Sequence, residues 1–562
     1  MKREGVSILT TKRALISVSN KTGIVIFAQE LVRLGWEIIS TGGTAAALRD
    51  AGISARDVSD LTGFPEILDG RLKTLHPKVH GAILGRRDLT LHVEQMEKHG
   101  IQEIGLVAVN LYPFPEVIAK EETTLEEAIE NIDIGGPAMI RAAAKNYRDV
   151  IIVVDPASYS TIVEELRQEN SLSLATRYKL ALEAFSHTAY YDSIISNYLR
   201  NRLEEEGGRL FPATITLPYV KAQELRYGEN PQQKAALYNE PIPPVVSIAS
   251  GRQIHGKELS FNNINDLQTA WGLVREFFDP AVVVVKHTNL CAAVTAPSLT
   301  EAYQKAYQAD SASFNGGIIV LNREIDEETA KLASRANLEI LATPFFSDVA
   351  KRALSFNKNI SLMEIPLGDP LGISLETPLE TILEASAEAP AEAPTEALPE
   401  TPQMIRRRME FCYDFKKVSG GLLLQEDLLD FFGPENWRIV TARKPTKQEL
   451  RDLIFALMVV KHAKTNATVI AKRLQTIGIG AGQTSRAASI WNAVQQAGED
   501  VRGSVMASDA ILTFEKGVET VAEAGVTAII QPGGSANDDE VIETCKKYGI
   551  AMVFTGQRYF KH

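Results

Sequence analysis

The 562-residue sequence is poor in cysteine. Only Cys291, Cys412 and Cys545 occur, far apart and without paired spacing. This scarcity excludes a disulfide framework and a thiolate metal site, and it favours a reducing compartment. No apolar run has the length of a membrane span, and the polar residues 1–12 lack the apolar core of a signal peptide. We therefore expect a cytoplasmic protein without a membrane partner.

The sequence also lacks an excess of positive charge. Its formal net charge is −12 at pH 7, which argues against nucleic acid as a partner because phosphate-backbone binding needs a basic face. Any anionic ligand must find a locally basic pocket. Hydrophobic residues make up 45% and charged residues 23% of the chain, as in ordinary globular proteins. A chain of this length should divide into several domains.

Aromatic residues are almost absent from residues 374–403, which are rich in Glu, Pro, Ala and Thr. Such a stretch cannot bury enough apolar surface to order itself. We predict a disordered, acidic surface insert, with a regulatory or partner-docking tail as the alternative. The expected divisions of the chain are residues 1–212, 213–367, 368–403 and 404–562, of which the third contains the insert.

Residues 13–212 alternate short apolar strands with helical stretches. This alternation is typical of an α/β fold built on a parallel sheet. The strands are expected at residues 14–18, 37–40, 104–109 and 150–154. Residues 217–367 and 404–562 predict two further α/β units.

Two polar turns follow the first two expected strands. Their candidate anion-binding residues are Ser17, Ser19, Lys21 and Thr22 in the first turn, and Ser40, Thr41, Gly42, Gly43 and Thr44 in the second. Hydroxyls, backbone amides and a lysine that converge at a helix N-terminus attract an anion. Together the turns predict a phosphate cradle, although either one alone is an ordinary turn with capping hydroxyls.

Further polar residues of the same domain are expected in loops and at strand ends. They are Arg71, Lys73, Thr74, Asn110, Tyr112, Asp133, Gly135 and Lys145. They concentrate cations, a hydroxyl and a carboxylate near the expected cradle. The alternative is that Tyr112 and Asp133 only hold turns.

One peptide occurs twice in the rest of the chain: Val-Val-Lys-His at residues 284–287 and again at residues 459–462, each followed by an Asn, Asn289 and Asn466. The echo suggests a duplicated unit; the alternative is that the pairs occur by chance and only end strands. The apolar run before Lys286 predicts a buried strand that presents Lys286 and His287 at its end, where α/β proteins place chemistry.

These motifs closely resemble the AICAR transformylase/IMP cyclohydrolase family of bifunctional purine-biosynthesis proteins. In the first half the resemblance rests on residues 17–23, 40–44, 70–77, 110–114 and 133–137. In the second half it rests on residues 225–231, 286–287, 419–422, 464–467, 531–535 and 555–556. It spans nearly the whole chain apart from the insert. It implies a methylglyoxal-synthase-like first domain followed by two cytidine-deaminase-like α/β units.

The resemblance implies two reactions. The second half would transfer a formyl group from 10-formyltetrahydrofolate to AICAR, giving FAICAR, and the first would close FAICAR to IMP with loss of water. Neither step needs a metal. His287 would act as base, and Lys286 and Asn466 would stabilise charge on the formyl oxygen. The cyclohydrolase site would use Lys73, Tyr112, Asp133 and Lys145.

Substrate-binding residues are also implied by the resemblance. In the first half they are Ser17, Ser19, Lys21, Thr22, Ser40, Thr41, Gly42, Gly43, Thr44, Arg71, Thr74, Asn110 and Gly135. In the second half they are Arg226, Tyr227, Gly316 and Arg558, and the folate contacts are Asn466, Pro532 and Asp538. The family also implies a homodimer whose transformylase sites lie at the subunit interface.

The second half departs from the family pattern at several positions. Asn315 stands where the family usually has an aromatic, Phe345 stands where it has a carboxylate, and residues 288–292 lack a Pro and a Gly. One alternative is a working cyclohydrolase whose transformylase half is weakened, lost or altered in its donor. Another is a nucleotide-binding regulatory protein without catalysis, against which the intact cyclohydrolase residues argue.

Overall fold

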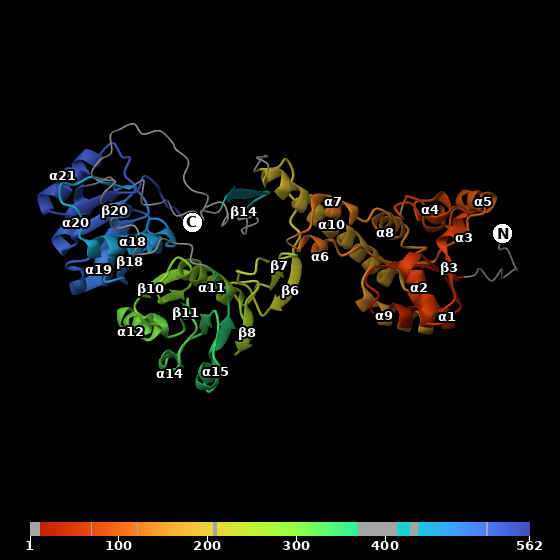
Figure 1. The fold of residues 1–562 in the computed structure, drawn as a ribbon, viewed down its shortest axis with the longest axis horizontal. Helices are drawn as coiled ribbons and strands as arrows, with labels where there is room; N and C mark the ends of the chain where they lie inside the picture. The colour runs from red at the N-terminus through yellow and green to blue at the C-terminus, as the bar shows by residue number, and fades with distance from the viewer. Residues whose placement is uncertain are drawn as a thin grey trace. The chain divides into compact units, whose positions relative to one another are not determined.

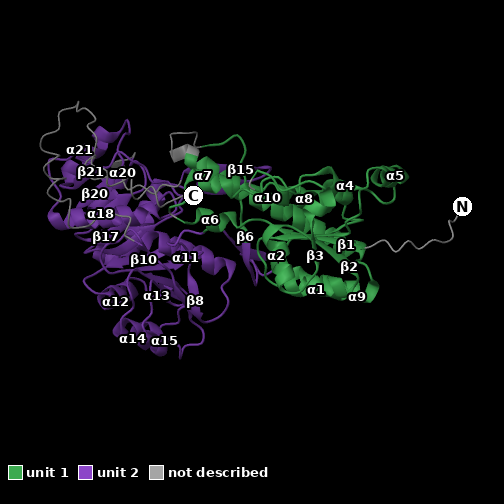
Figure 2. Cartoon of the chain, turned by 45° about the vertical axis from the view of Figure 1, so that its right-hand side comes forward, with its two compact units in different colours: residues 1–220, 240–242 green, residues 221–239, 243–562 purple. Residues whose placement is uncertain are grey.

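The computed structural model describes residues 12–68, 70–120, 122–205, 211–368, 413–426, 437–512 and 515–562 (Figure 1). The predicted acidic insert at residues 374–403 lies outside the described residues. The chain forms two compact units, residues 1–220 with 240–242 and residues 221–239 with 243–562 (Figure 2).

The first unit is built on a five-stranded parallel sheet with the strand order β3-β2-β1-β4-β5. Its strands are β1 (Lys12–Val18), β2 (Trp36–Ser40), β3 (Ala55–Asp57), β4 (Leu106–Asn110) and β5 (Ile151–Val153). The sheet confirms the parallel α/β prediction. The short strand β3 was not predicted, because its sequence Ala-Arg-Asp contains no apolar run.

Helices connect and cover these strands. They are α1 (Ile24–Arg33), α2 (Gly42–Asp50), α3 (Val58–Thr62), α4 (Pro77–Leu84), α5 (Thr90–Lys98), α6 (Phe114–Ile118), α7 (Leu125–Glu130), α8 (Gly135–Lys145), α9 (Tyr159–Glu169) and α10 (Leu174–Glu205). Helix α8 packs on β4 and β5, and α10 packs on α8 and β5. The chain runs from β1 through β2 to β3 towards one edge of the sheet, and from β4 to β5 towards the other, so the strand order reverses between β1 and β4. Ligands of open α/β sheets bind at such a switch point, outside the carboxyl ends of the strands.

The second unit is organised by one twelve-stranded mixed sheet with the order β16-β21-β20-β19-β17-β18-β10-β9-β11-β12-β13-β8. Its first-half strands are β8 (Arg252–His255), β9 (Ala281–Lys286), β10 (Asn289–Thr295), β11 (Ile318–Leu321), β12 (Ile340–Thr343) and β13 (Ser361–Glu364). Its second-half strands are β16 (Arg438–Ile439), β17 (Thr468–Lys472), β18 (Gln475–Gly480), β19 (Val505–Ser508), β20 (Ala528–Gln531) and β21 (Ala551–Phe554). Two separate hairpins pair β6 (Val220–Leu225) with β7 (Ala235–Asn239) and β14 (Tyr413–Val418) with β15 (Gly421–Glu426).

Matching helices accompany the two halves of this sheet. In the first half they are α11 (Phe261–Val274), α12 (Leu299–Ala309), α13 (Ser311–Phe314), α14 (Glu327–Arg335) and α15 (Asp348–Leu354). In the second half they are α18 (Lys447–Lys461), α19 (Arg486–Ala497), α20 (Glu515–Ala524) and α21 (Asp538–Tyr548). Helix α11 precedes the hairpin β9–β10 as α18 precedes the hairpin β17–β18. The halves meet where β10 pairs antiparallel with β18, so the unit is an internal duplication, as the echoed peptide suggested.

The two copies of the Lys-His peptide do not occupy equivalent places, however. The first ends strand β9 as predicted, whereas Lys461 ends helix α18 and His462 caps it. A continuous apolar run is compatible with either a buried strand or a buried helix, so the sequence could not tell them apart. The residue that corresponds to Lys286 in the second hairpin is Lys472, which ends β17.

Lys461 and His462 belong instead to a buried ion cluster that joins the halves. Lys461 Nζ donates to Glu276 Oε1 at 3.0 Å, and His462 Nε2 lies 3.0 Å from the same oxygen. Burial alone raises the pKa of Glu276, but the hydrogen bond from His462 and the charge of Lys461 outweigh it and lower that pKa to about 2. Burial lowers the pKa of His462 to about 4 against the opposing effect of Glu276.

Stability should therefore fall as the pH is lowered from about 6.5 towards 4. In this window the unfolded chain protonates His462 near its ordinary pKa while the folded chain keeps it neutral. The unfolded state then binds more protons, so the free energy of unfolding decreases. Glu276 adds to this fall at the acid end of the window, because its folded pKa is about 2 while the unfolded carboxyl begins to protonate near its ordinary pKa.

Calorimetric unfolding of wild type and His462→Gln between pH 7 and 4 measures this effect. The variant should lose less stability than wild type across the window, because the titrating group is gone. His92→Gln, in the first unit, is the control and should follow wild type. Equal slopes for wild type and His462→Gln would contradict the prediction.

Candidate active sites

The first unit joins its two predicted turns at the carboxyl edge of the sheet. Ser17 Oγ lies 2.7 Å from Thr41 Oγ1. The Thr44 hydroxyl accepts from the N–H of Val18 at 3.1 Å and donates to its carbonyl at 3.0 Å. The N-terminus of α2 is thereby fixed to the end of β1, with Gly42 and Gly43 exposed beside it.

Asn110, at the end of β4, connects that strand to the turn that follows β1. Its Oδ1 accepts from the N–H groups of Ser19 at 2.7 Å and Asn20 at 2.9 Å, and its Nδ2 donates to the Asn20 carbonyl at 3.1 Å. The exposed Lys21 and Thr22 follow directly. One amide side chain therefore sets the path of the backbone that leads into the expected phosphate cradle.

Ser40, like Thr44, bonds to the backbone of β1. Its side chain is fully buried, and its hydroxyl donates to the Ile16 carbonyl at 2.7 Å. The hydroxyl thus stabilises the pairing of β1 with β2 rather than facing solvent.

Lys73 and Asp133 lie near the same edge. A Cβ placed on Gly42 would be 3.8 Å from Lys73 Nζ, so the ammonium lies beside the start of α2. Burial raises the pKa of Asp133, while the Gly136 N–H and the Lys73 charge oppose this effect. Asp133 Oδ1 accepts from that N–H at 2.8 Å. A carboxylate and an ammonium are thus brought close to the cradle.

The remaining residues of this predicted site occupy different surroundings. A Cβ on Gly135 would lie 2.7 Å from Thr74 Oγ1, so only glycine allows α8 to begin against the buried Thr74. Tyr112 is 45% exposed, and Arg71 pairs with Glu130.

Lys145 is separated from this group. It ends α8, whereas Asp133 lies just before the start of that helix, and eleven residues at 1.5 Å each span about 16 Å. Lys145 instead lines a cavity of about 660 Å³ together with His80, Arg141 and Tyr178. A single chain therefore brings Lys73 and Asp133 together but leaves Lys145 apart from them.

In the second unit, Lys286 and His287 lie at the turn of the hairpin β9–β10. Lys286 pairs with Asn289, so His287 and Thr288 form a two-residue turn. Asp266 on α11 accepts from the N–H of His287 at 3.0 Å and that of Thr288 at 2.6 Å. Lys286 Nζ donates to the Asn315 carbonyl at 2.8 Å.

The loop after α18 brings Asn466 to the same region. Lys464 Nζ donates to Thr288 Oγ1 at 2.8 Å, which links this loop directly to the His287 turn. Asn466 Nδ2 donates to the Gln483 carbonyl at 2.8 Å. The predicted transformylase residues from the two halves of the unit are thus adjacent in one chain.

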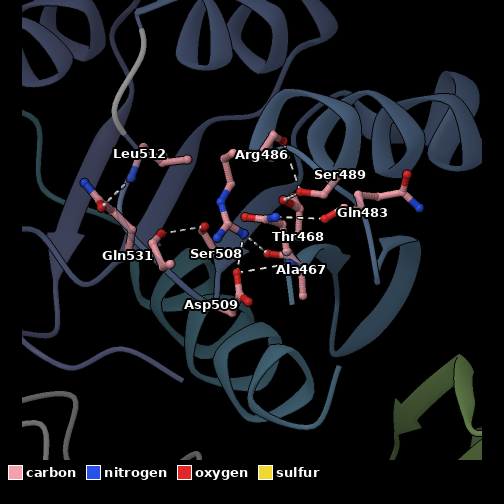
Figure 3. Close-up of polar contacts among 11 residues, drawn as sticks. Ala467, Thr468, Gln483, Arg486, Ser489, Ser508, Asp509, Leu512 and Gln531 are labelled. Atoms are coloured by element: carbon pink, nitrogen blue, oxygen red, sulfur yellow. Dashed lines mark hydrogen bonds and ion pairs between the residues drawn. The ribbon is translucent and has the colours of Figure 1, made fainter. Parts of the chain in front are cut away.

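A buried polar cluster fixes the backbone just after Asn466 (Figure 3). Asp509 Oδ1 accepts from the Ala467 N–H at 3.0 Å, and the Arg486 guanidinium donates to the Asp509 carboxylate and, at 2.8 Å, to the Ala467 carbonyl. Ala467 is therefore held through both its backbone N–H and its carbonyl.

The other predicted binding residues are spread over the second unit. Arg226 lies over the Tyr227 ring at 5.8 Å, and Arg558 over the Phe560 ring at 4.3 Å. The contacts of the remaining three are with backbone: Gly316 donates to the Asn337 carbonyl, Pro532 accepts from Gly556, and Asp538 accepts from Gly534. Asp266, Arg486 and Asp509 were not identified from sequence. For Asp266, the one feature that the sequence offers is its place on the apolar face of α11.

Among the described residues, no three His, Cys, Asp or Glu side chains are grouped as they would be to hold a metal ion. No helix in that part of the chain is both long and apolar enough to cross a membrane.

Comparison with known proteins identifies the family. Residues 23–138 match the MGS-like domain, and residues 143–390 and 397–496 match the AICARFT/IMPCHase bienzyme. The bifunctional purine biosynthesis protein PurH of Acetivibrio thermocellus is 49% identical and that of Ruminiclostridium cellulolyticum 48% identical, each over 98% of this chain and 100% of its own length. The crystal structure of ForH is 37% identical, covering 33% of this chain and 95% of that one, with a TM-score of 0.30.

The fold and these relatives define a bifunctional enzyme with a parallel α/β first unit and a duplicated second unit. The chain belongs to the AICARFT/IMPCHase bienzyme family.

Asn110→Ala should weaken nucleotide binding in the first unit. The two N–H groups that Asn110 orders would lose their acceptor, and the cradle backbone would lose its fixed path. We expect KM for the formylated nucleotide to rise at least about tenfold, as measured by its conversion to inosine monophosphate, because binding requires this ordered geometry.

Ser40→Ala is the matched control for this variant. It removes a hydroxyl that bonds only within the sheet, so it should lower thermal stability and leave KM nearly unchanged. The interpretation would be wrong if the two variants raised KM equally.

Proposed function

We propose that this chain catalyses the last two steps of de novo IMP synthesis. The second unit transfers a formyl group from 10-formyltetrahydrofolate to the 5-amino group of AICAR, and the first unit cyclises the resulting FAICAR to IMP. The observation that carries the proposal is the meeting of the Lys286–His287 turn with the Asn466 loop through the Lys464–Thr288 hydrogen bond. Family membership over nearly the whole chain supports both steps.

Formyl transfer needs help because the amino group of AICAR is a weak nucleophile. Its lone pair is delocalised into the imidazole ring and the carboxamide. His287 removes a proton as the nitrogen attacks the formyl carbon, and the Lys286 ammonium and Asn466 amide donate to the formyl oxygen as it gains charge. The C–N bond to the folate then breaks, and its nitrogen takes up a proton.

Cyclisation joins two groups of one molecule. The carboxamide nitrogen attacks the formyl carbon and water leaves, so positioning supplies much of the rate. The nucleotide phosphate binds the turns around Ser19, Lys21 and Gly42, and Lys73 and Asp133 act at the reacting groups. The closeness of Lys73 to the cradle supports this assignment.

The same proposal includes a homodimer in the cytoplasm. Lys145 belongs to the cyclohydrolase set by family resemblance, yet it lies at the opposite end of α8 from Asp133. A second copy supplies Lys145 to the site that contains Asp133. Exposed apolar residues of α10 near Lys145, among them Tyr178, Leu182 and Phe185, favour such an interface.

Two separate substrates test the function. The purified chain receives FAICAR alone, or AICAR with 10-formyltetrahydrofolate, and inosine monophosphate is followed in both reactions. Product should form in both. Lys286→Ala should lose product at least about a hundredfold only in the second reaction, because it removes a charge-stabilising donor from formyl transfer.

Lys73→Ala is the reciprocal variant. It should stop product in both reactions while FAICAR still accumulates in the second. If the wild type forms product in the FAICAR reaction but not in the reaction of AICAR with 10-formyltetrahydrofolate, the transformylase assignment is overturned and a cyclohydrolase remains. Nucleotide binding without product in either reaction would leave a binding protein.

A further inference from the structure

The two hairpin turns of the second unit share an unusual backbone conformation. His287 and Thr288 have φ angles of 55° and 59°, and Arg473 and Leu474, in the turn of β17–β18, have φ angles of 53° and 58°. Positive φ at both central residues is the geometry of a type I′ turn, which normally selects Asn-Gly or similar pairs. Neither hairpin here uses glycine.

This conformation is costly for side chains of these types. The Cβ of an L-residue is crowded by the carbonyl oxygen in this conformation, and β-branched residues such as Thr288 are especially disfavoured there. A two-residue turn also exposes two neighbouring N–H groups that need an acceptor. Something outside the turn must therefore stabilise it.

A carboxylate on the preceding helix supplies that stabilisation in both halves. Asp266 on α11 accepts from the N–H groups of His287 and Thr288 at 3.0 and 2.6 Å. Asp452 on α18 accepts from those of Arg473 and Leu474 at 3.0 and 2.8 Å. Asp266 is 8% and Asp452 4% exposed. The same clamp thus occurs twice.

Only one of the two clamped turns carries the predicted chemistry. His287 and its neighbour Lys286 are at the first turn, whereas the second turn holds Arg473 and Leu474. We propose that Asp266 is a positioning residue for formyl transfer, which fixes the backbone of His287 so that its imidazole reaches the reacting amine. This inference rests on the proposed transformylase function.

The contacts around the turn favour a role in geometry over a role in binding. Asp266 touches backbone, while the residues assigned to the nucleotide, Arg226 and Arg558, belong to other segments. The His287 carbonyl accepts from Asn289 Nδ2 at 2.9 Å, so the residue is held at both its N–H and its carbonyl. Loosening the turn should therefore affect the chemical step more than substrate affinity.

The experiment compares Asp266→Asn with Asp452→Asn in the full-length chain. Each substitution replaces one acceptor oxygen by an NH₂ group that opposes a backbone N–H. Both variants should lose a similar amount of thermal stability. For formyl transfer, Asp266→Asn should lower kcat at least about tenfold with less than about a threefold change in KM for AICAR, and Asp452→Asn should keep kcat within about threefold of wild type.

Coupling to His287 separates positioning from general damage. In a His287→Ala background, adding Asp266→Asn should cause no further loss of kcat, because no imidazole remains to be positioned. The inference would be overturned if the double variant lost kcat by the product of the two single losses. Equal kcat values for Asp266→Asn and Asp452→Asn would also overturn it. If Asp266→Asn does not fold, Asp266→Glu and Asp452→Glu replace the pair with the same expected contrast.

The assays also distinguish this inference from the proposed function. Wild-type protein that forms inosine monophosphate from FAICAR but transfers no formyl group would overturn the transformylase assignment and the inference together. An active wild type with no contrast between the two Asp variants would overturn the inference alone.

Discussion

The antiparallel pairing of β10 with β18 is the contact on which the second unit depends. Val294 lies opposite Gln475 in this seam, and the buried Thr476 hydroxyl accepts from the Ala293 N–H at 2.9 Å and bonds to its carbonyl at 3.2 Å. Because the seam makes the two halves one continuous sheet, the hairpin of the first half and the loop after α18 have a fixed relation. The Lys464–Thr288 hydrogen bond, and with it the candidate transformylase site, follows from that relation.

Buried carboxyl and amide groups that bind backbone recur at equivalent places on both sides of the seam. Asn322, after β11, accepts from the Ala281 N–H at 2.8 Å, and Asp509, after β19, accepts from the Ala467 N–H at 3.0 Å. The second half alone uses a charge here and pairs it with Arg486. A buried ion pair costs desolvation that an amide avoids. The ion pair adds the bond from Arg486 to the Ala467 carbonyl at 2.8 Å, whereas in the first half Asn322 Nδ2 itself donates to the Phe277 and Asp279 carbonyls.

The parallel sheet and its polar edge could be predicted because each relevant signal was local. Apolar runs marked four of the five strands, and the turns after β1 and β2 could be recognised from their hydroxyls and glycines. What depended on tertiary contacts was missed. Strand β3 is held by its pairing with β2 and has no apolar run of its own. Lys461 ends a helix although the apolar run before it is like that of β9. The Ser40 hydroxyl bonds within the sheet, which only the paired strands reveal. Asp266 could not be assigned to His287 without the fold, since 21 residues separate them.

Two of the departures from the family pattern leave the contacts of Lys286 and His287 unchanged. Asn315 replaces an aromatic, but Lys286 Nζ is bound by its backbone carbonyl, which a change of side chain at this position does not remove. The Asn315 side chain is itself held by Asn337 at 2.6 Å.

Phe345 replaces a carboxylate, yet the nearby ammonium of Lys351 lies 5.3 Å from its ring and is neutralised by Glu364 at 3.2 Å. Lys351 beside Phe345 therefore has a carboxylate partner. The residues that position Lys286 and His287, the Asn315 carbonyl and Asp266, are independent of both substitutions. The bonds of Lys286 to the Asn315 carbonyl and of Asp266 to the His287 turn therefore do not depend on the side chains at positions 315 and 345.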